Sequence, residues 1–267
     1  MRPTFGREYI ENEFQRIGDG LSEPLTVYLI GGGAMSLRDF KGATKDIDLV
    51  VPDGDAYGQL WAVLMDLGYA EVQSLDPDYR ALGATSCVEN DDGCRLDIFN
   101  QQVANKLVLT DGMQERSEPF LNLDRLTIRL VSNEDIFLFK AIAGRDDDIE
   151  DMNMLVQAGL DYDVVRDELE AQIERLGDDQ FATFANEALV ELKERYGVTT
   201  PIEARVQELT NRYYRGLEVL QSLDEPMTVD ELAAELELDA EEVHDRIAYL
   251  STFDRVRRDD GTVRPRE

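Results

Sequence analysis

The sequence has few of the side chains that bind transition metals or form disulfides. Its 267 residues include two cysteines and one histidine. The histidine, His244, is distant in sequence from Cys87 and Cys94, which argues against a zinc site. The cysteines flank the segment VENDDG. We expect them to be free thiols on a hairpin in a reducing compartment, with a cross-strand disulfide as the alternative.

Long apolar runs are also missing. The sequence has no apolar stretch of the roughly 18 residues that a membrane helix needs, so no membrane span is predicted. Its first residues, MRPTFGREYIENEF, lack the apolar core of a signal peptide, and we therefore expect a cytoplasmic protein. Hydrophobic residues still make up 43 % of the chain, which is enough to build cores. The length suits two or three domains.

Positive charge is scarce. Lysine and arginine total 27 against 57 acidic residues, which gives 27 − 57 = −30. The acids are spread along the whole chain, and only five of the basic residues are lysines: Lys41, Lys45, Lys106, Lys140 and Lys193. This composition resembles that of proteins from salt-in halophiles. In molar salt the screening length is only about 3 Å, so the repulsion among the acids is tolerable. The acidity then reports habitat rather than a class of partner.

Hydrophobic spacing predicts an α+β fold over residues 1–160, with a mixed sheet and flanking helices. One helix is expected to be capped by Ser132, with Asp135 at its third position. The predicted strands are 25–30, 45–52, 79–89, 94–100 and 123–131, and the predicted helices are 5–19, 31–38, 55–68, 132–144 and 146–159. Residues 161–211 continue as a helical region.

The last part of the chain, residues 212–267, has the pattern of a winged helix-turn-helix domain. A helix is expected over 212–223. Thr228 with Glu231, and Asp239 with Glu242, have the spacing of capping boxes that start two further helices. The sequence DDG near the end indicates the turn of a terminal β-hairpin. Three helices followed by a hairpin are the elements of a winged helix.

A glycine turn and two aspartates in residues 28–51 carry the main functional signal. Asp46 and Asp48 lie two apart on a predicted strand and therefore share one face, while Ile47 and Leu49 face the core. Two adjacent carboxylates repel each other unless a cation lies between them, and oxygen ligands suit Mg²⁺. Asp97, on a later strand, is expected to complete this site. Gly31, Gly32 and Gly33 follow a strand and open a helix, a place where backbone N–H groups bind phosphate.

This arrangement resembles the nucleotidyltransferase superfamily. Ile30, Gly31 and Gly32 are followed by thirteen residues and then by Asp46-Ile47-Asp48-Leu49. The strongest likeness is to the branch that holds AbiEii-type toxins and DUF6036-type proteins, which carry GGxA followed by TKDID, as Thr44 to Asp48 do here. The downstream segment FKAIAGRDDDIEDMNML also matches that branch, with Lys140, Arg145, Asp148 and Asp151. The resemblance covers roughly residues 25–160.

The resemblance implies a nucleotidyltransferase domain over residues 1–160 that uses Mg²⁺ or Mn²⁺ and a nucleoside triphosphate. Asp46, Asp48 and Asp97 are the predicted catalytic residues and metal ligands. The predicted nucleotide-binding residues are Gly31, Gly32, Gly33, Thr44, Lys45 and Lys140, supported by Arg145, Asp148 and Asp151. An acceptor hydroxyl on RNA or protein would attack the α-phosphate. The likeness to AbiEii-type toxins further implies a role beside a partner antitoxin.

Each of these residues also has a structural interpretation. Asp46 and Asp48 would be a solvated strand face in an acidic protein. Lys140 would be a surface lysine paired with nearby acids, and Arg145, Asp148 and Asp151 a salt-bridge cluster at a helix cap. Two other functions therefore stay open: a non-catalytic regulator that senses nucleotide and binds DNA through the winged helix, and a purely structural partner protein.

The terminal hairpin is the most basic part of the chain. Residues 254–267 contain five arginines and four acids, a net charge of +1. Phosphate contacts by Arg255, Arg257 and Arg258 would make it a nucleic-acid interface. The preceding helix is acidic, however, and winged helices also mediate dimerisation or protein binding. We therefore expect docking within the chain, or a homodimer, more than nucleic-acid binding.

Overall fold

The computed structural model describes residues 3–73, 83–103, 106–177, 179–259 and 261–266. The chain folds into two compact units, Met1–Glu168 and Leu169–Glu267. The predicted domain limits at 160 and 211 stay predictions. No helix in the described ranges has the length and apolar character to cross a membrane.

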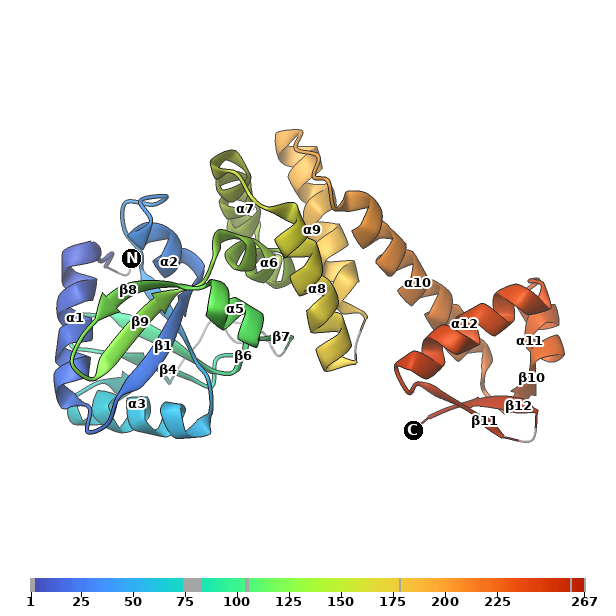
Figure 1. Ribbon diagram of the computed structural model, residues 1–267, viewed down its shortest axis with the longest axis horizontal. Helices are drawn as coiled ribbons and strands as arrows, with labels where there is room; N and C mark the ends of the chain where they lie inside the picture. Colours follow the sequence, from blue (N-terminus) through green and yellow to red (C-terminus); the bar gives the residue numbers. More distant parts are fainter. Residues whose placement is uncertain (1–2, 74–82, 104–105, 178, 260, 267) are drawn as a thin grey trace. The chain divides into compact units, whose positions relative to one another are not determined.

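A seven-stranded mixed sheet forms the centre of the first unit (Figure 1). Its central strands are buried and mostly apolar: β1 (Leu25–Ile30) pairs in parallel with β9 (Leu126–Leu130), β2 (Asp46–Val51) pairs in parallel with β5 (Arg95–Asn100), and β1 and β2 pair antiparallel. The strand order across the sheet is β3 (Ala70–Glu71), β4 (Ser86–Glu89), β5 (Arg95–Asn100), β2 (Asp46–Val51), β1 (Leu25–Ile30), β9 (Leu126–Leu130) and β8 (Glu118–Asn122). A separate two-stranded ribbon is formed by β6 (Gln102–Val103) and β7 (Leu107–Val108).

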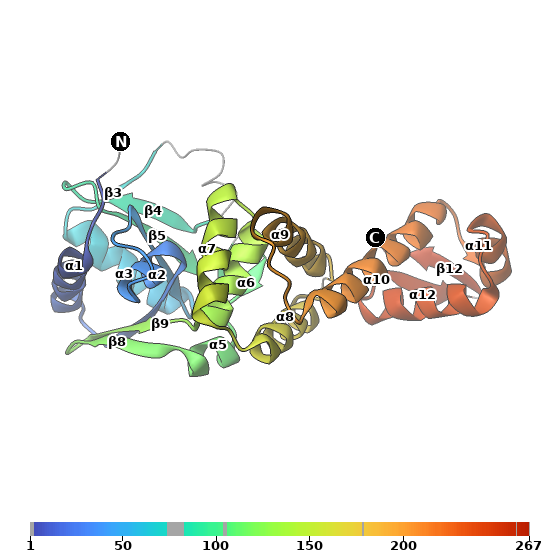
Figure 2. The ribbon, with the colours of Figure 1, turned by 90° about the horizontal axis from the view of Figure 1, so that it is seen from above.

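Helices follow the strands in the order that the hydrophobic spacing predicts. The helix α3 (Gly54–Asp66) packs against β1, β2 and β5, and α1 (Arg7–Gly20) contacts α3 and β9 (Figures 1 and 2). Ser132 caps α6 as predicted, its hydroxyl accepting from the backbone N–H of Asp135 at 3.2 Å. The helices of this unit are α1 (Arg7–Gly20), α2 (Gly31–Leu37), α3 (Gly54–Asp66), α5 (Asp111–Arg116), α6 (Asn133–Ala143) and α7 (Asp146–Ala158).

Three differences from the predicted elements have physical causes. The strand expected at 79–89 begins at Ser86, and its first part, 79–82, lies outside the described residues. The helix α5 is short and its start depends on the Thr110 side chain, which the hydrophobic spacing does not reveal. The strand β8 is also additional: it contains Pro119 and a bulge, features that an edge strand tolerates and that hide it from a hydrophobic pattern. The predicted hairpin of β4 and β5 is confirmed, with Cys87 and Cys94 as free buried thiols.

The second unit contains helices and a small three-stranded antiparallel sheet of order β10-β12-β11. Its C-terminal part has a core of its own, in which Val219, Leu232, Ile247 and Val263 meet. Its elements are α8 (Tyr162–Leu176), which spans the division between the units, α9 (Phe181–Tyr196), α10 (Glu203–Ser222), β10 (Met227–Thr228), α11 (Val229–Glu235), α12 (Ala240–Thr252), β11 (Val256–Asp259) and β12 (Thr262–Pro265).

The start of one helix is corrected by the structure. The helix expected at 212 begins at Glu203, and α10 continues through 211–212 without a break. No proline interrupts it, and Gly216 lies inside it because a Cβ there would stand 3.0 Å from Leu250. The capping box of Thr228 and Glu231 is confirmed. The backbone N–H of Glu242 donates to Asp239, whereas the Glu242 carboxylate pairs with Arg246.

Candidate active site

The glycine turn after β1 lies directly against Asp48. Gly31 has a left-handed φ of 61°, and a Cβ at this position would stand 2.5 Å from Asp48 Oδ2. The left-handed backbone favours glycine here, and the close approach of the carboxylate requires it. Gly32 is more open, since a Cβ there would meet only Thr44 Oγ1, at 3.8 Å. Gly33 packs against Leu29 and the backbone of β2, which makes it a packing residue.

The register of β2 and β5 brings the predicted acids together. Asp48 is the Cα partner of Asp97, and Asp46 is the partner of Arg95, in a parallel pair. Side chains at matched positions of neighbouring strands lie on the same face, so these four form one charged patch. Asp48 is half-buried. Burial, followed by the charge of Asp97, raises the pKa of Asp48 to about 6.

Asp97 lies behind the other two acids. Its side chain is almost fully buried, and the Arg95 Nε donates to its Oδ1 at 2.6 Å. The thiol of Cys87, the partner of Asp97 on β4, is also hydrogen-bonded to this pair. Burial and then Asp97 raise the pKa of the Cys87 thiol to about 12, so this thiol stays protonated at neutral pH.

Lys140 lies at the centre of a second charged group, formed by α6, α7 and the segment after α2. It is 5 % exposed, and its Nζ lies 2.7 Å from Asp148 Oδ1 and 2.8 Å from Asp151 Oδ2. Lys41 also pairs with Asp151. Burial lowers the pKa of Lys140, but the two carboxylates outweigh burial and raise this pKa above its ordinary value. The interpretation of Lys140 as a surface lysine is therefore wrong, whereas its expected pairing with nearby acids is confirmed.

Arg145 and Asp148 join this group at the N-terminus of α7. The Arg145 backbone N–H donates to Asp148 Oδ2 at 3.2 Å, and its guanidinium donates to both carboxylate oxygens at 2.8 and 3.0 Å. Burial raises the pKa of Asp148, but Arg145 and Lys140 outweigh it and hold this pKa below its ordinary value. The helix-cap interpretation of Arg145 and Asp148 thus describes their contacts.

Both charged groups open into one cleft with a volume of about 430 Å³. Most of the predicted site residues line it, whereas Gly31, Gly33 and Asp97 do not belong to its wall. The predicted site residues do not include Lys41, Ala43, Asp146 and Asp147, which also line the cleft. Lys41 lies in the matched segment and could have been found by that signal. The cleft is lined by Gly32, Lys41, Ala43, Thr44, Lys45, Asp46, Asp48, Lys140, Arg145, Asp146, Asp147, Asp148 and Asp151.

The carboxylates fit a divalent cation in part. Asp46 and Asp48 both line the cleft, and Asp48 makes no ion pair with any residue that the structure describes. A cation there would relieve the repulsion from Asp97, which adds to burial in raising the pKa of Asp48. Asp97 does not fit, because it already pairs with Arg95. Within the described ranges, no group of three or more His, Cys, Asp or Glu side chains is placed to hold a metal ion.

The predicted nucleic-acid arginines are held differently. Arg255 lies 2.8 Å from the buried Asp179, and Arg257 lies 3.0 Å from Asp259. Arg258 is exposed on β11. Asp260 of the predicted hairpin turn lies outside the described residues. Two of the three arginines named for phosphate contacts are therefore already paired with acids of the same unit.

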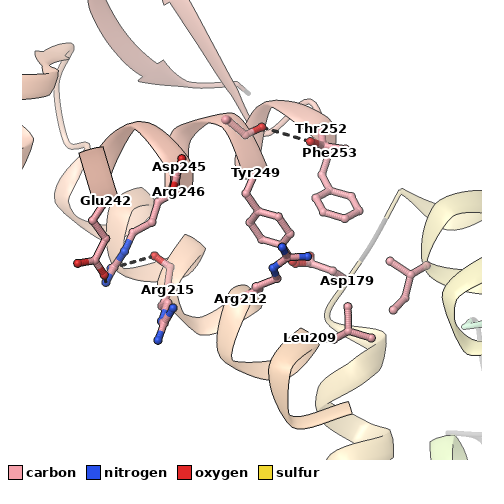
Figure 3. A pocket seen from close by; sticks show the side chains of 12 residues that line it. Asp179, Leu209, Arg212, Arg215, Glu242, Asp245, Arg246, Tyr249, Thr252 and Phe253 are labelled. Carbon is pink, nitrogen blue, oxygen red and sulfur yellow. Dashed lines mark hydrogen bonds and ion pairs between the residues drawn. The ribbon is translucent and has the colours of Figure 1, made fainter. Parts of the chain in front are cut away.

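A cavity of about 710 Å³ lies near these residues within the second unit (Figure 3). Arg212 lies over the ring of Tyr249 at 5.9 Å, and Phe253 stands beside Tyr249. Three arginines and three acids line the cavity, so their formal charges cancel and give no attraction for a polyanion. They are Arg212, Arg215, Arg246, Asp179, Glu242 and Asp245.

The sequence matches a known family of nucleotidyltransferases. Residues 10–196, more than half of the chain, match the family described as "Nucleotidyltransferase of unknown function (DUF6036)". The chain belongs to this family. The expected DUF6036 likeness is confirmed, whereas the AbiEii-type likeness stays a prediction. Nucleotidyltransferases typically use a divalent metal and an NTP, so membership implies both in general terms.

One solved structure and the curated proteins add little to this family assignment. The crystal structure of the lincosamide antibiotic adenylyltransferase LnuA, lincomycin-bound, is 19 % identical to the chain. The match covers 56 % of this chain and 93 % of that one, with a TM-score of 0.37. No curated protein matches the sequence.

Proposed function

We propose that this DUF6036 nucleotidyltransferase moves a nucleoside monophosphate from an NTP to an acceptor hydroxyl, and that the cleft beside Asp46 and Asp48 is its active site. The observation that carries the proposal is the convergence of the glycine turn, the two aspartates and the Lys140 cluster on one cleft. Four elements of the first unit, α2, β2, α6 and α7, contribute to its wall.

The roles follow from position and charge. Asp46 and Asp48 would hold Mg²⁺ or Mn²⁺, which when bound supplies charge neutralisation at the phosphates. Gly32 leaves room for phosphate to approach the backbone, and Thr44 and Lys45 stand on the same wall. The acceptor oxygen would form a bond to the α-phosphorus while the bond to the bridging oxygen breaks and pyrophosphate leaves.

The Lys140 cluster serves this site mainly by position. Lys140 is paired with Asp148 and Asp151, and Arg145 is paired with Asp148, so both cations already have carboxylate partners without a bound triphosphate. We propose that they hold the N-terminus of α7 at the cleft, together with Lys41, which pairs with Asp151 in the cleft wall. The predicted neutralisation of phosphate by Lys140 would require these pairs to rearrange.

A transfer assay tests the proposal. The full-length chain is incubated with each α-labelled NTP, Mg²⁺ or Mn²⁺, and total cellular RNA and protein in molar KCl. We expect label on one class of acceptor, and Asp48→Asn should reduce it to the level without enzyme. Asp55→Asn, which changes an exposed acid on α3, should leave transfer unchanged.

Two outcomes would contradict the proposal. Equal labelling by Asp48→Asn and the unchanged chain would remove this cleft as the site. If no NTP is transferred but NTP with Mg²⁺ still raises the melting temperature, the chain is the non-catalytic nucleotide sensor that the sequence left open. The nature of the labelled acceptor then decides whether RNA or protein is the substrate, and a toxin role requires in addition a partner antitoxin that blocks the labelling.

We also propose that residues 203–266 form a winged-helix module that docks to protein. Their three helices and the β10-β12-β11 sheet around one apolar core support this assignment. The pairing of the hairpin arginines with acids of the same unit favours a docking or homodimer role over nucleic-acid binding.

A further inference from the structure

Arg95 occupies a place in the charged patch and is not among the site residues predicted from the sequence. It is the register partner of Asp46, and it lies two residues before Asp97 on β5. Because alternate residues of a strand share a face, Arg95 and Asp97 stand beside Asp46 and Asp48. The patch therefore contains three carboxylates and one guanidinium of its own.

The pair of Arg95 and Asp97 is closed off from solvent. The two side chains are 5 % and 2 % exposed, and the Nε to Oδ1 distance is 2.6 Å. The Cys87 thiol adds a hydrogen bond to the pair from the opposite strand, β4. Neither Arg95 nor Asp97 contributes to the wall of the cleft, whereas Asp46 and Asp48 both do.

The carboxylate of Asp97 is buried and paired, whereas those of Asp46 and Asp48 line the cleft. A metal ion at Asp97 would have to displace a buried guanidinium, which would then be left without its carboxylate in a site that excludes water. A metal ion at Asp46 and Asp48 displaces no ion pair of Asp48 among the described residues. The same separation explains why the described residues show no three-acid metal site.

We propose that Arg95 acts as a built-in cation that withholds Asp97 from divalent metal, so that Asp46 and Asp48 alone hold the metal of the cleft. The inference rests on the proposed function of this site and deepens it. It makes Arg95 a specificity-determining residue for the number of metal ions, and it makes Asp97 a positioning residue for Arg95 rather than a ligand.

Counting bound Mn²⁺ tests this role without any assay of activity. The full-length chain is titrated with Mn²⁺ alone in molar KCl, which suppresses diffuse binding to its many acids, and free Mn²⁺ is measured by electron paramagnetic resonance. For each variant, the number of Mn²⁺ ions bound at the cleft is the difference between the ions bound by that variant and the ions bound when Asp48→Asn is added to it. We expect one ion in the unchanged chain and still one in Asp97→Asn.

Variants of Arg95 supply the converse. Arg95→Gln should raise the count to two, and Asp97→Asn in that background should bring it back to one. Arg95→Lys, which keeps the charge, should stay at one. A lower count in Asp97→Asn, or an unchanged count in a folded Arg95→Gln, would overturn the inference. If Arg95→Gln does not fold, the count in Asp97→Asn alone decides.

The same titration separates the inference from the proposed function. A count of zero in the unchanged chain would overturn the proposed metal site at Asp46 and Asp48. In that case, a gain of a site in Arg95→Gln that requires Asp97 would still show that Arg95 withholds Asp97 from metal, whereas no gain would overturn this role of Arg95 as well.

Discussion

The sequence predicts a functional site in the cleft of the first unit and in the hairpin of the second, and the structure supports the two predictions to different degrees. In the cleft, charged residues from β2, α6 and α7 converge on a shared cavity. In the hairpin, Arg255 and Arg257 are paired with acids, as are Arg264 with Asp259 and Arg266 with Asp254. Positive charge in the hairpin is therefore largely neutralised within the chain.

The difference shows which sequence signals carry function in a very acidic protein. Asp46 and Asp48 were selected by their spacing on a strand and by the glycine turn before them, and both signals constrain geometry. The hairpin arginines were selected by local excess charge alone. In a chain of net charge −30, an arginine pairs more readily with an acid of the same chain than with a phosphate of a nucleic acid.

Among the predicted substitutions, loss of the Lys140 amine should lower the free energy of unfolding of the first unit the most. Lys140→Met leaves Asp148 and Asp151 buried with one cation fewer, and such a loss costs about 3 to 5 kcal/mol. We expect the lower end of this range, because Arg145 still binds Asp148. The measurement is urea unfolding at constant KCl.

A matched lysine provides the control for this prediction. Lys193→Met removes an ion pair with Glu203 in which both partners are partly exposed, and it should cost about 0 to 1 kcal/mol. Equal costs for the two variants would mean that the Lys140 network does not stabilise the first unit. Lys140 would then be available to meet phosphate, as the sequence analysis first expected.

Local sequence rules predicted most of the first unit, and they failed where long-range contacts decide. The limits of β1 and the cap at Ser132 follow from apolar runs and hydroxyl chemistry. The pairing of β2 with β5, which places Asp97 beside Asp48, is a tertiary choice that no local pattern specifies. Arg95 stands two residues before Asp97 in the sequence, but a lone arginine on a strand gives no signal that it will pair with that carboxylate.

Arg255 should separate the hairpin arginines into two kinds. Its partner Asp179 is 1 % exposed, so Arg255→Met leaves a buried carboxylate with a lost partner, at a cost of about 1 to 3 kcal/mol. Arg264→Met removes a surface pair with Asp259 and should cost about 0 to 1 kcal/mol. Hydrogen exchange of α12 and β11 is the measurement, because Trp61 lies in the first unit and does not report on the second. Similar exchange in both variants would show that the Asp179 pair does not anchor this module.

The smallest effect is expected when the hairpin is tested for nucleic-acid binding. Arg257→Ser with Arg258→Ser removes the two exposed cations of β11 that the nucleic-acid interpretation needs most. If both contacted phosphates of duplex DNA, the slope of log affinity against log salt would fall by about 2. We expect no such fall, because Arg257 is already paired with Asp259 and α12 presents Glu241 and Asp245.

Fluorescence anisotropy with labelled DNA and RNA at several KCl concentrations measures the slope, and light scattering of the same samples reports the oligomeric state. A slope reduced by about 2 would restore the DNA-binding regulator, whereas an unchanged slope with an altered oligomeric state would support docking between copies of the chain.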